Sequence, residues 1–130
     1  MKALQPPGWP RPKGYSNGMA ARGRIIVTAG VVGWNEEERF TSDRLADQFA
    51  QALRNILAVL ACDGADVSRV VRLTCYVTSI DEYLESAKEI GATWSAMMGK
   101  HYPAMALVEV VRLVERQAKI EIEATAVVPE

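Results

Sequence analysis

Apolar residues recur at spacings of three and four between residues 45 and 60, which is the period of an amphipathic α-helix. They are Leu45, Phe49, Ala52, Leu53, Ile56, Leu57 and Leu60. The polar cluster Thr41-Ser42-Asp43 precedes them and can cap a helix, and Gly64 follows them and can adopt the left-handed conformation that ends one. The pattern therefore predicts a helix between Asp43 and Gly64.

A second stretch with helical spacing runs from residue 80 to residue 98. Its apolar positions are Ile80, Tyr83, Leu84, Ala87, Ile90, Trp94 and Met97 or Met98. Ser79 or Asp81 can cap its N-terminus, and Gly99 can end it. We predict a second helix over this stretch.

Four segments have the composition of strands. Residues 24–29 are short and rich in β-branched side chains, and residues 71–78 and 119–128 alternate between apolar and polar positions. Residues 104–111 are apolar on both alternations apart from one glutamate, which is typical of a strand that is buried on both faces. The link LVERQA before the last strand is short enough for a hairpin-like connection.

Prolines divide the chain, because four of them fall within the first 12 residues and the next is Pro103. Residues 1–18 are therefore predicted to form an irregular arm. The predicted order of elements is β, β, α, β, α, β, β. This order is that of an α/β (α+β) domain in which two helices cover one face of a mixed sheet.

The second face of the predicted sheet lacks a cover. We expect it to carry Thr74, Tyr76, Met105, Leu107 and Val127, a set that would be costly to leave in water. Self-association is the simplest way to cover such a face, so the sequence predicts an oligomer.

Composition adds limits to this picture. A chain of 130 residues and 14.3 kDa is enough for a single domain, residues 1–130, and too short for two. The net charge of -1 argues against a dedicated nucleic-acid binder, although residues 1–35 hold five basic residues and no acidic one. Small molecules and other copies of the chain are the expected partners.

The two cysteines, Cys62 and Cys75, match neither a disulfide framework nor a zinc motif, and both are expected to be reduced and buried. The longest apolar run, residues 56–62, has seven residues, against about 20 for a membrane helix. The first 20 residues lack the apolar core of a signal peptide. We therefore expect a cytoplasmic protein that does not enter a membrane.

Few residues offer chemistry. Neither GxGxxG nor GxxxxGK[ST] occurs, the only histidine is His101, and no aspartates cluster, so we expect no nucleotide cofactor and no metal. His101 can act as a general acid or base, or it can contact the last carbonyls of the second helix, which is the simpler interpretation. Glu121 is either a catalytic carboxylate or part of a solvated strand face, and Trp34 either lines a pocket or anchors its loop.

An ordered set of segments resembles the RidA/YjgF family, also called endoribonuclease L-PSP. The segments are 14–17 (GYSN), 25–30 (IIVTAG), 51–56 (QALRNI), 69–77 (RVVRLTCYV), 102–104 (YPA), 108–110 (VEV) and 120–126 (IEIEATA). The similarity covers nearly the whole chain, from about residue 14 to residue 128.

The resemblance implies a chorismate-mutase-like fold with a mixed six-stranded sheet, two helices on one face, and a homotrimer with clefts between adjacent subunits. It also implies hydrolysis of enamines and imines such as 2-aminoacrylate and 2-iminobutanoate, without metal or cofactor. Tyr15, Gly30 and Glu121 match positions at which the family places a tyrosine that contacts the substrate, a backbone contact, and the carboxylate that positions or activates water.

The sequence departs from the family at the carboxylate clamp. The family motif reads Pro-Ala-Arg-Ser, and its arginine binds the substrate carboxylate, whereas this chain has Pro103-Ala104-Met105-Ala106. Two charge-assisted hydrogen bonds of roughly 1.5–3 kcal/mol each are absent, and Leu107 makes the expected cleft more apolar. Arg24 or Arg72 could replace the clamp only by reaching the cleft.

Three functions follow from these observations. The first is an enamine or imine hydrolase of altered specificity, in which Met105, Leu107 and Trp34 form apolar walls and Tyr15 and Glu121 form polar contacts. The second is a trimer that binds or senses a small ligand without catalysis. The third, ribonuclease activity, is disfavoured because the chain has one histidine and a net charge of -1.

Overall fold

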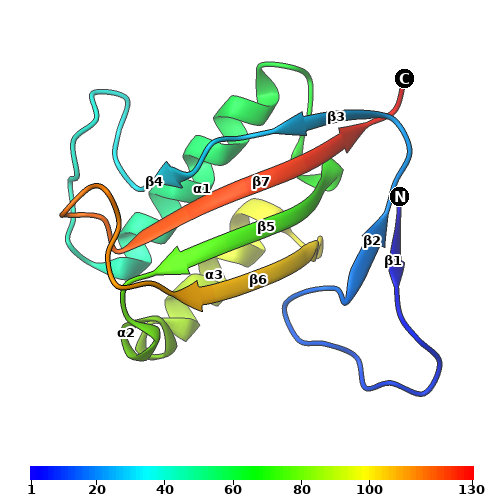
Figure 1. Ribbon diagram of the computed structural model, residues 1–130, viewed down its shortest axis with the longest axis horizontal. Coiled ribbons are helices and arrows are strands. Elements are labelled where there is room, and N and C mark those ends of the chain that lie inside the picture. Colours follow the sequence, from blue (N-terminus) through cyan, green and yellow to red (C-terminus); the bar gives the residue numbers. More distant parts are fainter.

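In a computed structural model, which describes residues 1–130, the alternating segment of the sequence forms strand β5 (Val70–Val77) inside a five-stranded sheet. β7 (Ile120–Val128) pairs antiparallel with β5 on one side, and β6 (Ala104–Glu109) pairs parallel with it on the other. β3 (Arg24–Val27) and β4 (Val31–Val32) pair antiparallel with the two ends of β7 (Figure 1). The sheet is therefore mixed, as predicted.

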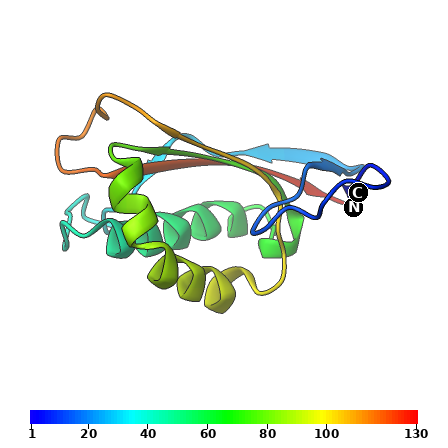
Figure 2. The ribbon, with the colours of Figure 1, turned by 90° about the horizontal axis from the view of Figure 1, so that it is seen from below.

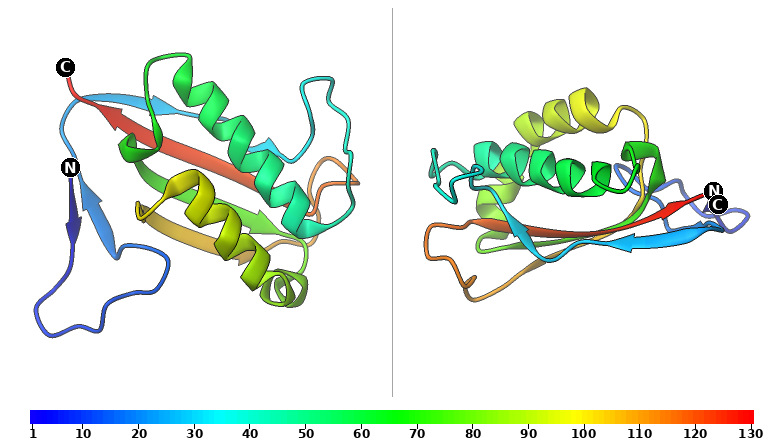
Figure 3. Two further views of the ribbon diagram at one scale, coloured as in Figure 1. Left: turned by 180° about the vertical axis from the view of Figure 1, so that it is seen from behind. Right: turned by 90° about the horizontal axis from the view of Figure 1, so that it is seen from above.

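Three helices cover one face of this sheet, and no element of the chain covers the other (Figure 2). They are α1 (Leu45–Ala61), α2 (Ile80–Glu85) and α3 (Ala87–Met98), and a short 3₁₀ turn (Val67–Arg69) leads into β5. α1 and α3 lie side by side across the strands (Figure 3). The apolar face of α1 predicted from the sequence is the centre of the core, because Phe49, Ala52, Leu53, Ile56 and Leu60 are all buried there. The α+β class is confirmed.

The predicted boundaries of α1 hold only at its C-terminal end. Gly64 has a φ of 78°, the left-handed conformation expected after a helix. The N-cap residue is Arg44, whose side chain makes no capping hydrogen bond. Ser42 instead accepts a hydrogen bond from the Arg44 backbone N–H (3.0 Å) and donates one to Asp47 (2.7 Å), which lowers the pKa of Asp47.

The predicted second helix is two helices. Ser79 caps α2 by accepting a hydrogen bond from the Glu82 backbone N–H (3.1 Å), as one of the two proposed caps requires. At Ser86 the backbone leaves the helical conformation (φ -92°, ψ 2°), and α3 begins one residue later. Neither glycine nor proline marks this break, so the helical spacing of apolar residues continues through it and conceals it.

The sheet has five strands rather than the expected six, because the N-terminal residues form a separate small sheet. β1 (Lys2–Leu4) pairs antiparallel with β2 (Gly18–Ala20), so the arm at residues 1–18 is not wholly irregular. Three-residue strands are too short for alternation to reveal them. The arm meets the main sheet at Ser16, which bridges to Ala104 at the start of β6.

The hairpin-like link predicted between the last two strands is wrong, because β6 and β7 lie on opposite sides of β5. The connection passes the end of β5, where the Val110 N–H donates to the Val77 carbonyl (2.8 Å) and the Thr78 N–H donates to that of Lys119 (3.1 Å). A parallel partner on one side of β5 and an antiparallel partner on the other require this crossing.

The register of β6 corrects the expected membership of the open sheet face. Met105 pairs with Leu73 and Leu107 with Cys75, so both point toward the helices rather than to the open face. The open face is formed mainly by Ile25, Val27, Arg72, Thr74, Tyr76, Ala104, Ala106, Val108, Glu121, Glu123, Thr125 and Val127. Ile25 and Val27 are 68% and 67% exposed, and no residue of β6 is fully buried within one chain.

Two further expectations are corrected by the packing. Cys75 is buried, as predicted, and burial raises the pKa of its thiol to about 12, but Cys62 is exposed just after α1. The ring of His101 donates from Nε2 to the Val70 carbonyl (2.7 Å), a contact with β5 rather than with the last carbonyls of the preceding helix. Both the exposure of Cys62 after α1 and the contact of His101 with β5 depend on tertiary packing, which the local sequence does not indicate.

None of the helices combines the length and the apolar character that crossing a lipid bilayer requires.

Candidate functional site

Glu121 and Gly30 are in direct contact at one end of the sheet. Glu121 lies on β7 with its side chain on the open face, between Val32 of β4 and Tyr76 of β5. Gly30 precedes β4, and a Cβ added to it would lie 2.6 Å from Oε2 of Glu121. The missing side chain at Gly30 therefore leaves the space in which the Glu121 carboxylate lies.

A second carboxylate on the same face is held by a tyrosine. The Tyr76 hydroxyl donates to Oε1 of Glu123 (2.7 Å). This hydrogen bond raises the pKa of Tyr76, and burial and the negative charges of Glu123 and Glu121 act in the same direction. Glu121 thus lies in a polar strip of the open face together with Tyr76 and Glu123.

Trp34 makes the contacts of a packing residue. Its ring lies against Phe40 with the ring centroids 5.7 Å apart, and its carbonyl accepts a hydrogen bond from Asn55 of α1 (2.7 Å). These contacts fix the loop after β4 on α1. They favour the interpretation of Trp34 as an anchor over that of a pocket wall.

Met105 lines an apolar groove of about 310 Å³ between β6 and the helices, which we call the α3 groove. Its lining residues are Gly14, Phe49, Tyr83, Ala87, Ile90, Gly91, Trp94, Ser95, Tyr102 and Met105. None of them carries a charge. The aromatic members were not identified as site residues from the sequence, because at helical spacing they are indistinguishable from core positions. Leu107 lies farther along the same side of β6.

Tyr15 lies in the N-terminal arm beside the same edge of the sheet. It is 42% exposed and shares a hollow of about 300 Å³ with Tyr102, which also lines the α3 groove. Ser16 fixes this part of the arm, because its hydroxyl donates to the Tyr102 carbonyl and its N–H to that of Pro103. Tyr15 and Met105 therefore belong to one region of the molecule.

Tyr15 and Met105 thus lie beside the start of β6, whereas Gly30 and Glu121 lie beside β4 and the start of β7, at the other end of the sheet (Figure 1). Tyr15 adjoins the start of β6, where Ala104 pairs with Arg72, whereas Glu121 pairs with Tyr76. Four residues of β5 separate these pairing positions, about 13 Å at a strand rise of roughly 3.3 Å per residue. A single chain therefore does not bring Tyr15 and Glu121 together.

Neither arginine proposed as a substitute clamp lies with Glu121 inside one chain. Arg24 forms an ion pair with Asp63 and lies opposite Val128, seven residues along β7 from Glu121. Arg72 is exposed on the open face, and its charge counteracts the raised pKa of Tyr76. Arg72 is the closer of the two to the Glu121 strip.

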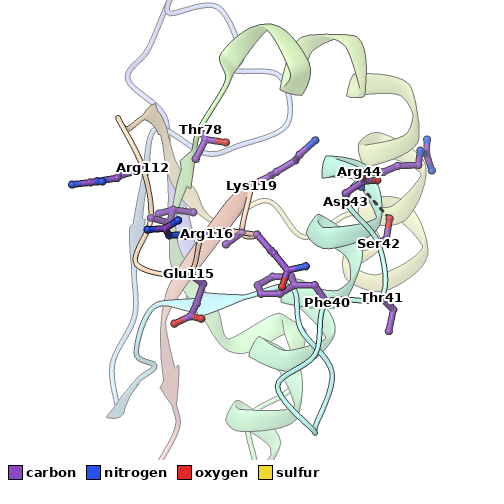
Figure 4. Close-up of a pocket in the computed structure, with 13 residues that line it drawn as sticks. Phe40, Thr41, Ser42, Asp43, Arg44, Thr78, Arg112, Glu115, Arg116 and Lys119 are labelled. Carbon is purple, nitrogen blue, oxygen red and sulfur yellow. Dashed lines mark hydrogen bonds between the residues drawn. The ribbon is translucent and has the colours of Figure 1, made fainter.

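The largest hollow, of about 910 Å³, lies between the start of α1 and the connection from β6 to β7 (Figure 4). It contains none of the predicted site residues. Arg44 is bound to Asp47 (3.2 Å) and Glu89 (2.6 Å), Lys119 is bound to Glu82 (2.8 Å), and Arg112 extends away from the hollow. Two of the four cations that line the hollow, Arg44 and Lys119, are thus already paired with carboxylates of the chain.

No three side chains of His, Cys, Asp or Glu gather in an arrangement that could hold a metal ion. The chemistry that remains is that of the Glu121 carboxylate, the tyrosine hydroxyls and the apolar groove.

The fold, with its helices on one face of a mixed sheet, is that of the RidA/YjgF proteins. The family model described as Endoribonuclease L-PSP matches residues 10–128, and the chain belongs to this family. The resemblance in the sequence is therefore confirmed.

Relatives and solved structures agree with this assignment. The 2-iminobutanoate/2-iminopropanoate deaminase of Escherichia coli K12 is 32% identical over 108 residues, covering 81% of this chain and 80% of the relative. A Rid-family protein of unknown function, YyfB from Yersinia pestis, superposes with a TM-score of 0.83 at 30% identity and 98% coverage of both chains. The YjgF gene product of E. coli superposes with a TM-score of 0.68 at 31% identity, again over 98% of both.

Proposed function

We propose that this protein is a homotrimer that binds a small molecule in clefts between adjacent subunits and hydrolyses an enamine or imine there. Its specificity differs from that for 2-iminobutanoate and 2-aminoacrylate. The observation that carries the proposal is the division of the site residues: Gly30 and Glu121 lie at one end of the sheet, and Tyr15 and Met105 at the other.

The open sheet face supports the trimer. Ile25 and Val27 of β3 and Val108 of β6 are exposed on its two edge strands within one chain, and leaving these apolar side chains in water is unfavourable. A closed ring built from head-to-tail contacts sets one patch of each subunit against a different patch of its neighbour, and in the proposed trimer the open face is covered in this way. Each cleft then receives Glu121 from one subunit and Met105 from the next.

The reaction needs one water molecule and one proton shuttle. Water forms a C–O bond at the carbon of the protonated imine while the Glu121 carboxylate accepts one of its protons, which gives a neutral carbinolamine. Glu121 returns that proton to the nitrogen, the C–N bond breaks with its electron pair on the departing ammonia, and the hydroxyl proton passes to the carboxylate as the carbonyl forms. An enamine first takes a proton at carbon and then follows the same course.

Altered specificity follows from Met105. By the family resemblance, this position holds the arginine that binds the substrate carboxylate, and a thioether supplies no hydrogen-bond donor. The uncharged lining of the surrounding groove strengthens this inference. Substrates without a carboxylate are therefore expected to be hydrolysed better, relative to 2-iminobutanoate, than by relatives with the arginine.

The test is ammonia release from 2-iminobutanoate generated enzymatically in the assay and from imines that lack a carboxylate. Glu121→Gln is expected to lower kcat by about 100-fold or more, because it removes the general base. Glu123→Gln is the matched control: it lies on the same strand and face, and its amide oxygen still accepts the Tyr76 hydrogen bond.

The outcomes separate the candidate functions. Full activity in Glu121→Gln removes this residue from the mechanism, and rapid turnover of 2-iminobutanoate refutes the argument from Met105. If the protein hydrolyses no imine yet binds a small ligand saturably, the non-catalytic alternative is correct. A mass near 14.3 kDa in solution contradicts the trimer.

A further inference from the structure

We propose that the α3 groove receives an aromatic or branched aliphatic side chain of the substrate, so that the protein acts on imines with large apolar substituents. This inference rests on the proposed function, because it assigns the groove around Met105 to the same cleft as Glu121. It adds a substrate class and a set of specificity residues outside β6.

The size and walls of the groove fit such a group. A cavity of about 150 Å³ holds a benzene molecule in other proteins, and the volume here is about 310 Å³. Trp94 and Tyr102 form one wall, with their rings nearly parallel (7°) and their centroids 6.1 Å apart. The Trp94 Nε1–H donates to the His101 carbonyl (3.2 Å), which holds the indole in place.

The groove offers an apolar substituent no competing charge. The polar side-chain atoms of its lining are the hydroxyls of Tyr83, Ser95 and Tyr102 and the Trp94 N–H, which is already bonded within the chain. A charged substituent would lose water there without gaining a partner of opposite charge. Pockets of this composition fix a ligand through apolar contact and orient it with a few polar groups.

Gly91 keeps the groove open. It lies inside α3, where glycine is the poorest helix former after proline, and its φ is not positive. A Cβ added to Gly91 would meet no atom within 4 Å, so packing within the chain does not require the glycine. The space beside it belongs to the groove, and a larger side chain at this position would extend into that space.

Substitution of Gly91 therefore tests the proposal. Gly91→Leu is expected to lower kcat/KM for a phenyl-substituted imine, relative to a methyl-substituted one, by ~10-fold or more. Ala92→Leu is the matched control, because it adds the same side chain to an exposed position next along α3. The imines are generated in the assay from the corresponding amines, and the melting temperature confirms that each variant folds.

A binding measurement separates failure of this inference from failure of the proposed function. If no imine is hydrolysed, calorimetric titration with phenylacetaldehyde, the expected product from a phenylethyl imine, still tests the groove. Saturable binding that Gly91→Leu weakens about tenfold and Ala92→Leu does not supports the groove without catalysis.

Three results overturn the proposal. The first is that the wild type hydrolyses phenyl-substituted and methyl-substituted imines with equal kcat/KM. The second is that Gly91→Leu alters neither the substrate preference nor the affinity for phenylacetaldehyde. The third is that Gly91→Leu changes the oligomeric mass while it retains the wild-type preference. The last result would identify the groove as a contact between subunits.

Discussion

Adding one methyl group at Gly30 and at Gly33 tests which contacts hold the Glu121 end of the sheet. These glycines flank β4, and neither has a positive φ, so alanine fits both backbones without strain. At Gly33 the new carbon would lie 2.3 Å from the Gln48 carbonyl oxygen and 2.7 Å from the Gln48 Cα. At Gly30 it would lie 2.6 Å from Oε2 of Glu121.

The two substitutions differ in what must move. At Gly33 the obstacle is the backbone of α1, which cannot retreat without disturbing the core, and overpacking of this kind costs about 1–3 kcal/mol. An unfolding entropy of roughly 2.1 cal/mol/K per residue makes each kcal/mol worth about 4 °C for a chain of this length, so Gly33→Ala should lower Tm by about 4–11 °C. At Gly30 the obstacle is the end of a flexible side chain, and Gly30→Ala should change Tm little.

Imine hydrolysis should be lowered more by Gly30→Ala than by Gly33→Ala. Gly30→Ala must displace the Glu121 carboxylate by about 0.5 Å or more, and a displacement of about 1 Å at a catalytic group can cost about 100-fold in rate. We therefore expect Gly30→Ala to fold normally and to lose most of its imine hydrolysis. The measurements are thermal melts by circular dichroism at one protein concentration, since Tm of an oligomer depends on concentration, and ammonia release.

Several results would refute this reasoning. If Gly33→Ala melts with the wild type, β4 does not pack on α1 as described. If Gly30→Ala loses as much stability as Gly33→Ala, the space beside Glu121 is not limited by a movable side chain. If Gly30→Ala retains full activity, the position of the carboxylate is unimportant and its proposed role fails.

Two other predictions address pH and assembly. Because burial raises the pKa of Cys75, the unfolded chain releases the thiol proton at a lower pH than the folded chain, and the free energy of unfolding should fall as pH rises from about 9 toward 12. Cys75→Ala should make this fall less steep in denaturant titrations across that pH range. An unaltered pH dependence would contradict burial of the thiol. Mixed trimers of Glu121→Gln and Gly91→Leu subunits should recover activity on a phenyl-substituted imine. Random mixing leaves about a quarter of the clefts with an intact Glu121 from one subunit and an intact groove from the next. If mixtures verified by mass spectrometry recover no activity, the site is not shared between subunits.

The sequence was most informative where periodicity reports burial directly. Leu53 and Ile56 of α1 and Leu73 and Cys75 of β5 follow their patterns because each element has one face in the core. The family resemblance gave the arrangement of the elements, since a mixed sheet has many topologies compatible with the same pattern. Gly30 and Glu121 could be paired only through that resemblance, because 90 residues separate them.

The wrong predictions concern segments in which the pattern of apolar residues does not indicate which face a side chain lies on. Residues 104–111 are apolar at nearly every position, so alternation cannot say which side chains face the helices, and Met105 and Leu107 were placed on the wrong face. Their direction is set by pairing with Leu73 and Cys75 on the neighbouring parallel strand, a tertiary contact. The break at Ser86 and the hairpin of the arm were concealed for a similar reason, because each interrupts the pattern by too few residues.

The single chain has a divided site and an exposed sheet face, and assembly with further copies of the chain would resolve both. Glu121 lies on the open face, whereas the α3 groove lies on the helix side of the sheet, and the open face leaves Ile25 and Val27 in water. If further copies of the chain meet both needs, assembly and catalysis must fail together. Val27→Asp places a carboxylate on the covered face, which costs several kcal/mol when it is buried without a partner, and should yield monomers.

The monomer should then hydrolyse no imine, although Val27 belongs to neither half of the site. Val59→Asp, on the outer face of α1, is the matched control and should leave both mass and activity unchanged. Sedimentation and ammonia release at the same protein concentration provide the comparison. A folded Val27→Asp monomer with wild-type activity would show that one chain contains a complete site, and the division of residues between subunits would have no role in function.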